Sequence, residues 1–170
     1  MKQLGEMIVS KNLTKQTNEL NRLACRGIIY QNDKLLMIYS KFYNDYTFPG
    51  GGAENGEDEV LALERECREE AGVIIHNVRP FFKTIEKREI DEESYLLHES
   101  HFYLCDIKEF CEKALCDYEV DLGYETRWLT VDEAIFFDEK KKALLKDSDY
   151  DGVLERELRI LYELKKVIEV

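Results

Sequence analysis

The amino-acid sequence predicts a single α/β domain, in which helices pack on the faces of a β-sheet. Three observations lead to this class. Segments rich in β-branched and aromatic residues alternate with segments whose apolar residues recur at helical spacing. The 170 residues are 44% hydrophobic, which suffices for one core. No Ser-rich or Gly-rich linker is present, so we expect one domain over residues 1–170, with residues 1–21 as an N-terminal extension.

The first predicted element is a β-hairpin. Residues 22–30 and 34–39 are apolar and rich in Ile, Leu and Tyr, and the turn-forming residues 31–33 separate them. The next segment, from Tyr43 to Glu57, is expected to be a loop, because Pro49 and three consecutive glycines favour irregular backbone.

A helix is predicted over residues 57–71. Its core-facing stripe recurs at helical spacing and consists of Val60, Leu63, Cys67 and Ala71. Gly72 follows at the position where a left-handed C-terminal cap is favoured. The helix is therefore expected to end at residue 71.

The second half of the chain predicts more sheet and two more helices. Strand-like residues occupy 73–75, 81–85, 95–107 and 127–130. Thr130 and Glu133 have capping-box spacing for a helix that continues through Ala134. A C-terminal helix packed on the domain is expected over residues 151–168, with an amphipathic leucine stripe formed by Leu154, Leu158, Leu161 and Leu164.

Composition excludes several classes of protein. The formal net charge of −12 disfavours binding to a nucleic-acid polymer, although cations held by carboxylates would still allow a small anionic substrate. Five cysteines without a C-x-x-C pair argue against a disulfide framework and against a zinc cluster. Because no stretch has the apolar character of a signal peptide or a membrane span, we expect a cytoplasmic location and no membrane partner.

The strongest chemical signal is a group of carboxylates on the helix predicted over residues 57–71. Glu66, Glu69 and Glu70 stand at positions i, i+3 and i+4, so an α-helix places them on one face. Like charges so close repel each other unless a cation compensates them. Mg²⁺ or Mn²⁺ prefers such oxygen ligands, so we expect a divalent-metal site.

The neighbouring residues suggest how this site is built. Arg65 is close enough in a helix to Glu57 and Glu69 to orient their carboxylates. The glycine-rich turn at 49–52 would bring backbone carbonyls to the metal. Bound metal orients an attacking water, and a spare carboxylate accepts its proton, so pyrophosphate hydrolysis is the expected reaction.

The stretch from Gly51 to Val73 resembles the Nudix box, G-x5-E-x7-R-E-U-x-E-E-x-G-U, where U is aliphatic. The matching positions are Gly51, Glu57, Arg65, Glu66, Cys67, Glu69, Glu70, Gly72 and Val73. Cys67 departs mildly from the pattern, because a buried thiol behaves as a small hydrophobe. The lead-in YTFPGG and the downstream GYETRWLTVDEAI extend the resemblance over most of residues 22–135.

The resemblance implies an α/β/α sandwich on a mixed sheet, and a metal site for Mg²⁺ or Mn²⁺. Glu66, Glu69 and Glu70 would bind the metal, joined by the Gly50 carbonyl, with Glu57 and Arg65 in support. Members of the family also recruit an acid from a distant loop as base or ligand, for which the candidates are Glu119, Asp121 and Glu125. Homodimers are common in the family, so the resemblance makes a homodimer possible.

Other residues have two interpretations each. Arg26 would bind a distal phosphate or pair with an acid. Tyr46, Phe48 and Tyr103 would stack on a nucleobase or belong to the core. His98 and His101 face opposite sides of a strand, which excludes a two-His ligand pair but allows one catalytic His. The segment Asp147–Gly152 begins like a calcium loop, but Leu158 replaces the required Glu, so a helix-capping loop is expected.

The sequence therefore predicts a metal-dependent pyrophosphohydrolase acting on a small nucleotide-type substrate. A nucleoside triphosphate, ADP-ribose, an NDP-sugar and a dinucleoside polyphosphate all fit the same chemistry. The alternative is a catalytically silent Nudix-like domain that binds nucleotide or regulates a partner. Every carboxylate of the box is present, which favours the enzyme. An isomerase acting on isopentenyl diphosphate would need further residues that the sequence does not show.

Overall fold

A computed structural model describes residues 1–10, 13, 16–146 and 152–168. The strands are β1 (Lys2–Gln3), β2 (Ile8–Val9), β3 (Asn18–Gln31), β4 (Lys34–Ser40), β5 (Asp45–Thr47), β6 (Gly50–Gly52), β7 (Val73–Glu89), β8 (Ser94–Phe110) and β9 (Tyr124–Leu129). The helices are α1 (Glu59–Glu66), its π-helical continuation η1 (Cys67–Ala71), α2 (Asp117–Asp121), α3 (Val131–Leu144) and α4 (Val153–Ile168). The expected capping loop at Asp147–Gly152 lies outside the described residues, except for Gly152.

The strands form one mixed sheet in the order β1-β7-β8-β3-β4-β5. Strand β2 also pairs with β7, β6 with β3 and β9 with β4. The pairs β3–β8, β1–β7 and β2–β7 are parallel, and the others are antiparallel. This arrangement confirms the predicted mixed sheet.

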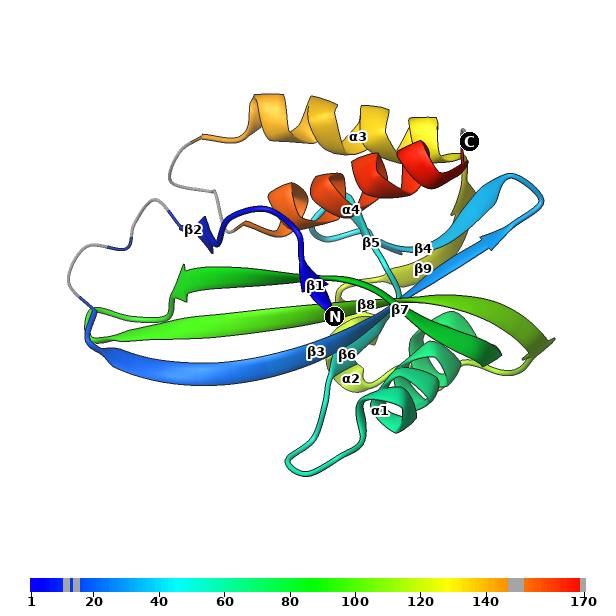
Figure 1. Cartoon of the computed structure of the whole chain (residues 1–170), viewed down its shortest axis with the longest axis horizontal. Helices are drawn as coiled ribbons and strands as arrows, with labels where there is room; N and C mark the ends of the chain where they lie inside the picture. The colour runs from blue at the N-terminus through cyan, green and yellow to red at the C-terminus, as the bar shows by residue number, and fades with distance from the viewer. Residues whose placement is uncertain (11–12, 14–15, 147–151, 169–170) are drawn as a thin grey trace.

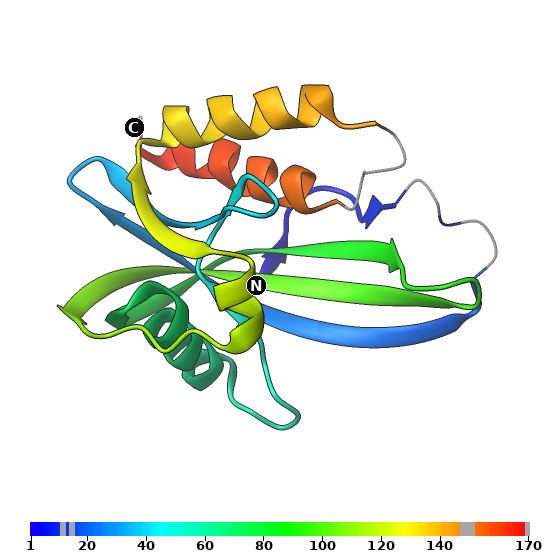
Figure 2. The ribbon, with the colours of Figure 1, turned by 180° about the vertical axis from the view of Figure 1, so that it is seen from behind.

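Helices cover both faces of the sheet. Helices α3 and α4 lie together over one face, and α1 and α2 lie on the opposite side (Figure 1; Figure 2). Alternate residues of β4 supply the two cores, because successive side chains of a strand point to opposite faces. Leu35 and Met37 pack in the core under α3 and α4, whereas Leu36 and Ile38 pack in the core under α1. The α/β/α sandwich is confirmed.

Several predicted elements are confirmed with changed limits. The hairpin turns at Asn32 and Asp33, both with positive φ, and its first strand begins at Asn18 instead of residue 22. Thr130 and Glu133 form the predicted capping box of α3. The leucine stripe of α4 is buried as predicted.

Other elements differ from the prediction. The predicted loop between Tyr43 and Glu57 contains two short strands: β5 pairs with β4, and β6, the backbone of the glycine turn, pairs with β3. The predicted strands at 73–75 and 81–85 belong to one long strand, β7, whose register shifts around Pro80. The helix predicted from residue 57 begins at Glu59, because the side chain of Asp58 caps its N-terminus.

Candidate active site

The site begins with the glycine turn at β6, which lies against β3. Gly50 pairs with Arg26 in the sheet and has φ of +135°, and a Cβ at Gly50 would lie 2.1 Å from the carbonyl oxygen of Cys25. A Cβ at Gly51 would lie 2.6 Å from the carboxyl carbon of Glu66. Gly50 is therefore required for the close approach to β3, whereas a side chain at Gly51 would displace the Glu66 carboxylate.

The end of the first helix brings a second carboxylate to the turn. Glu70 is only 7% exposed, and its Oε2 accepts a hydrogen bond of 2.8 Å from the backbone nitrogen of Gly50. Glu70 belongs to η1, where the nitrogen of Gly72 donates to the carbonyl oxygen of Cys67, five residues earlier. Such π segments inside helices occur frequently at functional sites.

Glu66, Glu70 and Glu119 form a cluster, here called the acidic trio. One carboxylate oxygen from each lies within 4.8 Å of the other two. Of the three loop acids named from the sequence, the structure thus brings Glu119, on α2, to the site. Asp121 is exposed, and Glu125 pairs with Lys41 and Arg127 instead.

Glu69 lies next to the acidic trio but outside it. A π turn contains more residues than an α turn, so each residue advances by a smaller angle around the helix axis. Glu70, at i+4, therefore lies closer to the face of Glu66 than in an α-helix, and Glu69, at i+3, lies further from it. The side chain of Glu69 is 33% exposed and lies 3.5 Å from Nη1 of Arg65. The prediction that all three helix carboxylates share one face assumed an α-helix throughout, and the structure departs from it here.

Arg65 holds the surrounding acids in place. Its Nε and Nη2 donate to the two oxygens of Glu57, at 3.0 Å each, and Nη1 donates to Glu66 at 2.7 Å. Nη2 also donates to the carbonyl oxygen of Gly52 at 3.2 Å. The hydrogen bonds from Arg65 lower the pKa of Glu57 to about 2. Arg65 therefore joins Glu57 to Glu66 beside the acidic trio.

Burial controls the protonation of two members of the acidic trio, Glu66 and Glu70. It raises the pKa of Glu70 to about 8, against the opposing effects of the Gly50 N–H and Arg26. Burial also raises the pKa of Glu66, and nearby Glu119 and Glu69 add to the shift. A cation placed among these carboxylates would favour their charged forms.

The acidic trio lines one part of a cleft with a volume of about 450 Å³. The glycine turn lines the same cleft, as do Tyr43, Tyr118 and Tyr124. The same cleft is also lined by Ser40, Asp45, Thr47, Cys116 and Val153, and by five residues here called the basic half: Arg22, Arg26, Arg88, His98 and Arg156. The cleft therefore joins a group of carboxylates to a group of arginines, on a chain with a net charge of −12.

The residues predicted to bind substrate have different positions. Arg26 lines the cleft, and its Nη1 donates to the carbonyl oxygens of Phe48 and Gly50, so a cation at the Gly50 oxygen would share that oxygen with a guanidinium group. Tyr46 and Phe48 lie in the core under α3 and α4 instead of on the cleft wall. Phe48 is fully buried and packs edge-on against Phe102.

The two histidines of β8 face opposite sides, as predicted. His98 lines the cleft, whereas His101 lies 2.6 Å from both Glu59 and Glu99 on the other face. Tyr103 also hydrogen-bonds to Glu59 and belongs to the core under α1. Neither His101 nor Tyr103 lines the cleft.

The sequence interpretation missed the three cleft tyrosines and most of the basic half. Arg22, Arg88 and Arg156 lie on β3, β7 and α4, so these arginines meet only when the helix packs on the sheet. Their spacing in the sequence carries no motif. The alternation of polar residues along β7 and β8 was a usable signal, but it is also typical of a solvent-facing strand.

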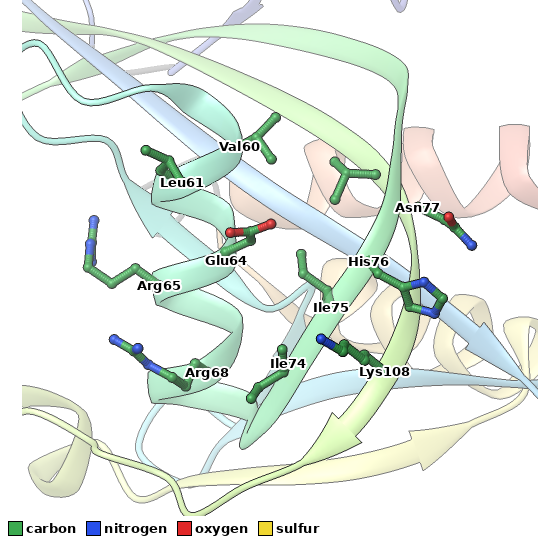
Figure 3. Close-up of a pocket in the computed structure, with 11 residues that line it drawn as sticks. Val60, Leu61, Glu64, Arg65, Arg68, Ile74, Ile75, His76, Asn77 and Lys108 are labelled. Atoms are coloured by element: carbon green, nitrogen blue, oxygen red, sulfur yellow. The ribbon is translucent and has the colours of Figure 1, made fainter.

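A second hollow of about 700 Å³ lies between α1 and the paired ends of β7 and β8 (Figure 3). Val60, Leu61, Ile74 and Ile75 supply much of its wall, and Glu64 and His76 supply polar groups. Glu66, Glu70 and Glu119 do not line it. The hollow is therefore separate from the acidic trio.

Comparison with known proteins decides the family. The sequence profile of the NUDIX domain matches residues 20–149. The chain belongs to the NUDIX domain family. This membership confirms the resemblance carried by the Nudix box, and the match covers the acidic trio and most of the sheet.

Curated relatives of this NUDIX chain are phosphohydrolases by name. Diphosphoinositol polyphosphate phosphohydrolase 2 of Rattus norvegicus is 30% identical over 110 residues, which cover 62% of this chain and 54% of that protein. The enzyme of the same name from Homo sapiens matches with the same identity and coverage. The chain thus spans about half the length of these relatives.

Solved NUDIX structures share the fold. A NUDIX hydrolase from Nitrosomonas europaea superposes with a TM-score of 0.58 at 18% identity, covering 86% of this chain and 91% of that one. The MutT NUDIX hydrolase from Burkholderia pseudomallei superposes with a TM-score of 0.53 at 21% identity, covering 67% of this chain and 86% of that one. Within the described residues, no helix combines the length and the apolar character needed to cross a membrane.

Proposed function

We propose that this chain is a divalent-metal-dependent pyrophosphohydrolase that cleaves a phosphoanhydride bond in a small anionic substrate. The observation that carries the proposal is the meeting of Glu66, Glu70 and Glu119 on the wall of a cleft that the glycine turn also lines. The family and the names of the relatives support the same reaction class.

The acidic trio fits Mg²⁺ or Mn²⁺ by donor type and by spacing. Both ions prefer oxygen ligands, and oxygens on opposite sides of a Mg²⁺ ion lie about 4 Å apart. The trio offers three carboxylate oxygens within 4.8 Å of one another. Burial already makes ionisation of Glu70 unfavourable, so a bound cation would compensate its charge. When bound, the cation would polarise a phosphoryl oxygen and make water more acidic.

The chain's own residues would position the reactants. The Arg65 guanidinium fixes Glu57 and Glu66 through three hydrogen bonds, which keeps the helix carboxylates from turning away. Glu69, next to the acidic trio and partly exposed, would accept the proton of the attacking water. The water oxygen bonds to phosphorus, the bridging oxygen leaves with the bonding electron pair, and two phosphate-ended products result.

The substrate belongs to the group of compounds that carry a diphosphate linked to another moiety. The sequence-based candidates are nucleoside triphosphates, ADP-ribose, NDP-sugars and dinucleoside polyphosphates. The names of the relatives add diphosphoinositol polyphosphates. Tyr43, Tyr118 and Tyr124 on the cleft wall offer aromatic faces to a base or a ring.

The test is phosphate release from a panel of these five compound classes, with Mg²⁺ or Mn²⁺ and with phosphatase coupling where needed. Turnover that EDTA abolishes and added metal restores is the expected result. If no compound is cleaved but one of them raises the melting temperature, the silent binding domain becomes the better description.

Three further expectations from the sequence stay predictions. A homodimer would appear in size-exclusion chromatography with light scattering. A cytoplasmic location would appear when the tagged full chain is localised in cells. The net charge of −12 predicts that the protein does not bind a nucleic-acid polymer, and a filter-binding assay at physiological salt would then show no retained DNA or RNA.

A further inference from the structure

The basic half of the cleft rests on a row of polar side chains across three neighbouring strands. The register aligns Arg22 on β3 with His98 on β8, and His98 with Glu86 on β7. Directly aligned residues of a sheet project to the same face, so the three strands present one polar surface. Arg156 approaches this surface from α4, and its Nη1 donates to Glu86 at 3.1 Å.

Positive charge exceeds negative charge in the basic half. The four guanidinium groups of Arg22, Arg26, Arg88 and Arg156 line it. Two buried carboxylates balance part of this charge, since Glu86 pairs with Arg88 and Arg156, and Glu157 pairs with Arg156. Four guanidinium groups against these two carboxylates leave two positive charges in the basic half, and Asp45, the other acid of the cleft besides the acidic trio, pairs with Lys141.

Buried polar atoms in the basic half lack partners. His98 is 3% exposed, and within the described residues neither of its ring nitrogens has a hydrogen-bond partner. Nε of Arg26 is also buried and unpartnered there. Buried polar groups are normally satisfied, so these unpartnered atoms beside the cleft leave hydrogen-bonding capacity that a ligand or an ordered water would fill. Burial and the surrounding arginines lower the pKa of His98 to about 2, which leaves it neutral, able to donate from one nitrogen and accept at the other.

Phosphate is the ligand chemistry that these groups fit best. The guanidinium fork matches two phosphate oxygens at once, and a neutral imidazole adds one N–H donor. The basic half and the acidic trio line the same cleft of about 450 Å³, so one molecule can reach both.

We infer that the basic half is a second anion-binding site that takes a phosphate group, and that the substrate carries at least one phosphate beyond the diphosphate to be cut. The second part of this inference rests on the proposed function. Among the candidate substrates it favours phosphate-rich compounds, such as diphosphoinositol polyphosphates, over ADP-ribose.

The first experiment measures anion binding in EDTA, where metal-dependent hydrolysis plays no part. Inorganic phosphate and tripolyphosphate are titrated into the full chain by calorimetry. The double variant Arg22→Met, Arg88→Met removes the two side chains that are least involved in packing, because Arg22 is exposed and Glu86 keeps Arg156 as a partner. Each lost charge-assisted contact should weaken binding by about tenfold.

Arg79→Met is the matched control, since Arg79 also lies on β7 but is 63% exposed and outside the cleft. Its anion binding should equal that of the wild type. A ¹⁵N spectrum of the ring nitrogens gives a second readout, in which phosphate should shift His98 and leave exposed His76 unchanged. Absence of wild-type binding at millimolar anion, or equal binding by the double variant with no shift at His98, overturns the anion site.

The second experiment distinguishes a substrate phosphate from free phosphate. With metal present, the double variant should raise KM for a diphosphoinositol polyphosphate at least about tenfold, with a much smaller change for ADP-ribose. If the double variant changes KM equally for both substrates, the substrate inference is contradicted. If the wild type binds phosphate but the double variant leaves both KM values unchanged, the site binds free phosphate instead of a substrate phosphate. If wild-type protein cleaves nothing, the proposed function fails, whereas the titration in EDTA still decides the anion site.

Discussion

The backbone nitrogen of Gly50 donates a hydrogen bond of 2.8 Å to the buried carboxylate of Glu70. This contact joins the glycine turn to the π-helical end of the helix that follows it in the chain. Because burial raises the pKa of Glu70 to about 8, the contact is one of few features that favour the charged form. The turn and the helix end therefore form one unit, and changes in either should alter the acidic trio.

Replacing Gly51 with alanine should lower turnover while the chain still folds. The new Cβ would meet the Glu66 carboxylate at 2.6 Å, so Glu66 has to move. A misplacement of about 1 Å at a reacting site costs on the order of 100-fold in rate. The matched control is Gly56→Asn, because Gly56 has open space around it and Asn tolerates its positive φ. Steady-state kinetics and melting curves of both variants check the prediction, and a Gly51→Ala enzyme as fast as the control would contradict it.

Metal binding should release a proton from Glu70 below pH 8. A folded-state pKa raised from 4.5 to about 8 means that metal-free protein loses stability as pH rises between these values. A cation binds the charged form and expels the proton. Calorimetric titration of Mg²⁺ at pH 6.5 in two buffers of different ionisation enthalpy should give release approaching one proton, falling toward zero above pH 9. Glu70→Gln should release clearly less, with Glu66, whose pKa is also raised, as the remaining source, and equal release by this variant would assign the proton to another group.

Glu119 should matter for metal affinity and Asp121 should not. Glu119→Gln replaces one of the three carboxylates of the acidic trio with a neutral amide, and it should weaken Mn²⁺ binding by about tenfold to 100-fold, the range seen for other changes around metal ligands. Asp121→Asn, on the same short helix but exposed, is the control. Equal affinity of the two variants would exclude Glu119 as a ligand.

Glu69→Gln should leave metal affinity closer to wild type than Glu119→Gln does, because Glu69 lies outside the acidic trio. It should still reduce turnover by orders of magnitude if Glu69 accepts the proton of the attacking water. Metal titration and kinetics of the same preparation separate the two effects. Unchanged turnover would contradict the assigned role, and a large loss of metal affinity would make Glu69 a ligand instead.

Arg156→Met should destabilise the fold. Arg156 is 2% exposed and pairs with the fully buried carboxylates of Glu86 and Glu157. Removing one partner of a buried ion pair costs about 3–5 kcal/mol of unfolding free energy, because it leaves an uncompensated buried charge. Urea denaturation followed by circular dichroism measures the difference. A loss below about 1 kcal/mol, the range of exposed ion pairs, would show that these charges are solvated.

Local periodicity predicted the α/β class and the helix that carries the carboxylates, whereas the α/β/α sandwich on a mixed sheet followed from the resemblance to the Nudix box. It placed Glu66 and Glu70 correctly on a common face, since the spacing i, i+4 tolerates the π turn. It did not separate Glu69 from them, because no residue pattern marked the change from α to π geometry at Cys67.

Tertiary contacts decided what the sequence left open. Glu119 could be chosen over Asp121 and Glu125 only once the short helix α2 was placed beside η1. The basic half depends on the register of β3, β8 and β7, which brings Arg22, His98 and Glu86 into one row. In the sequence these residues resemble the polar side of an exposed strand, so the burial of His98 and Glu86 was not visible.

The most direct test of the central claim is metal-dependent turnover of the best panel substrate by three proteins: wild type, Glu70→Gln and Glu64→Gln. Glu64 lies on the same helix as the Nudix carboxylates, is exposed and lies outside the acidic trio, so its variant controls for charge and helix stability. The account predicts EDTA-sensitive turnover in wild type and Glu64→Gln, and a loss of at least about 100-fold in Glu70→Gln with the fold retained. Turnover of folded Glu70→Gln equal to that of Glu64→Gln would contradict the assignment of the acidic trio as the metal site.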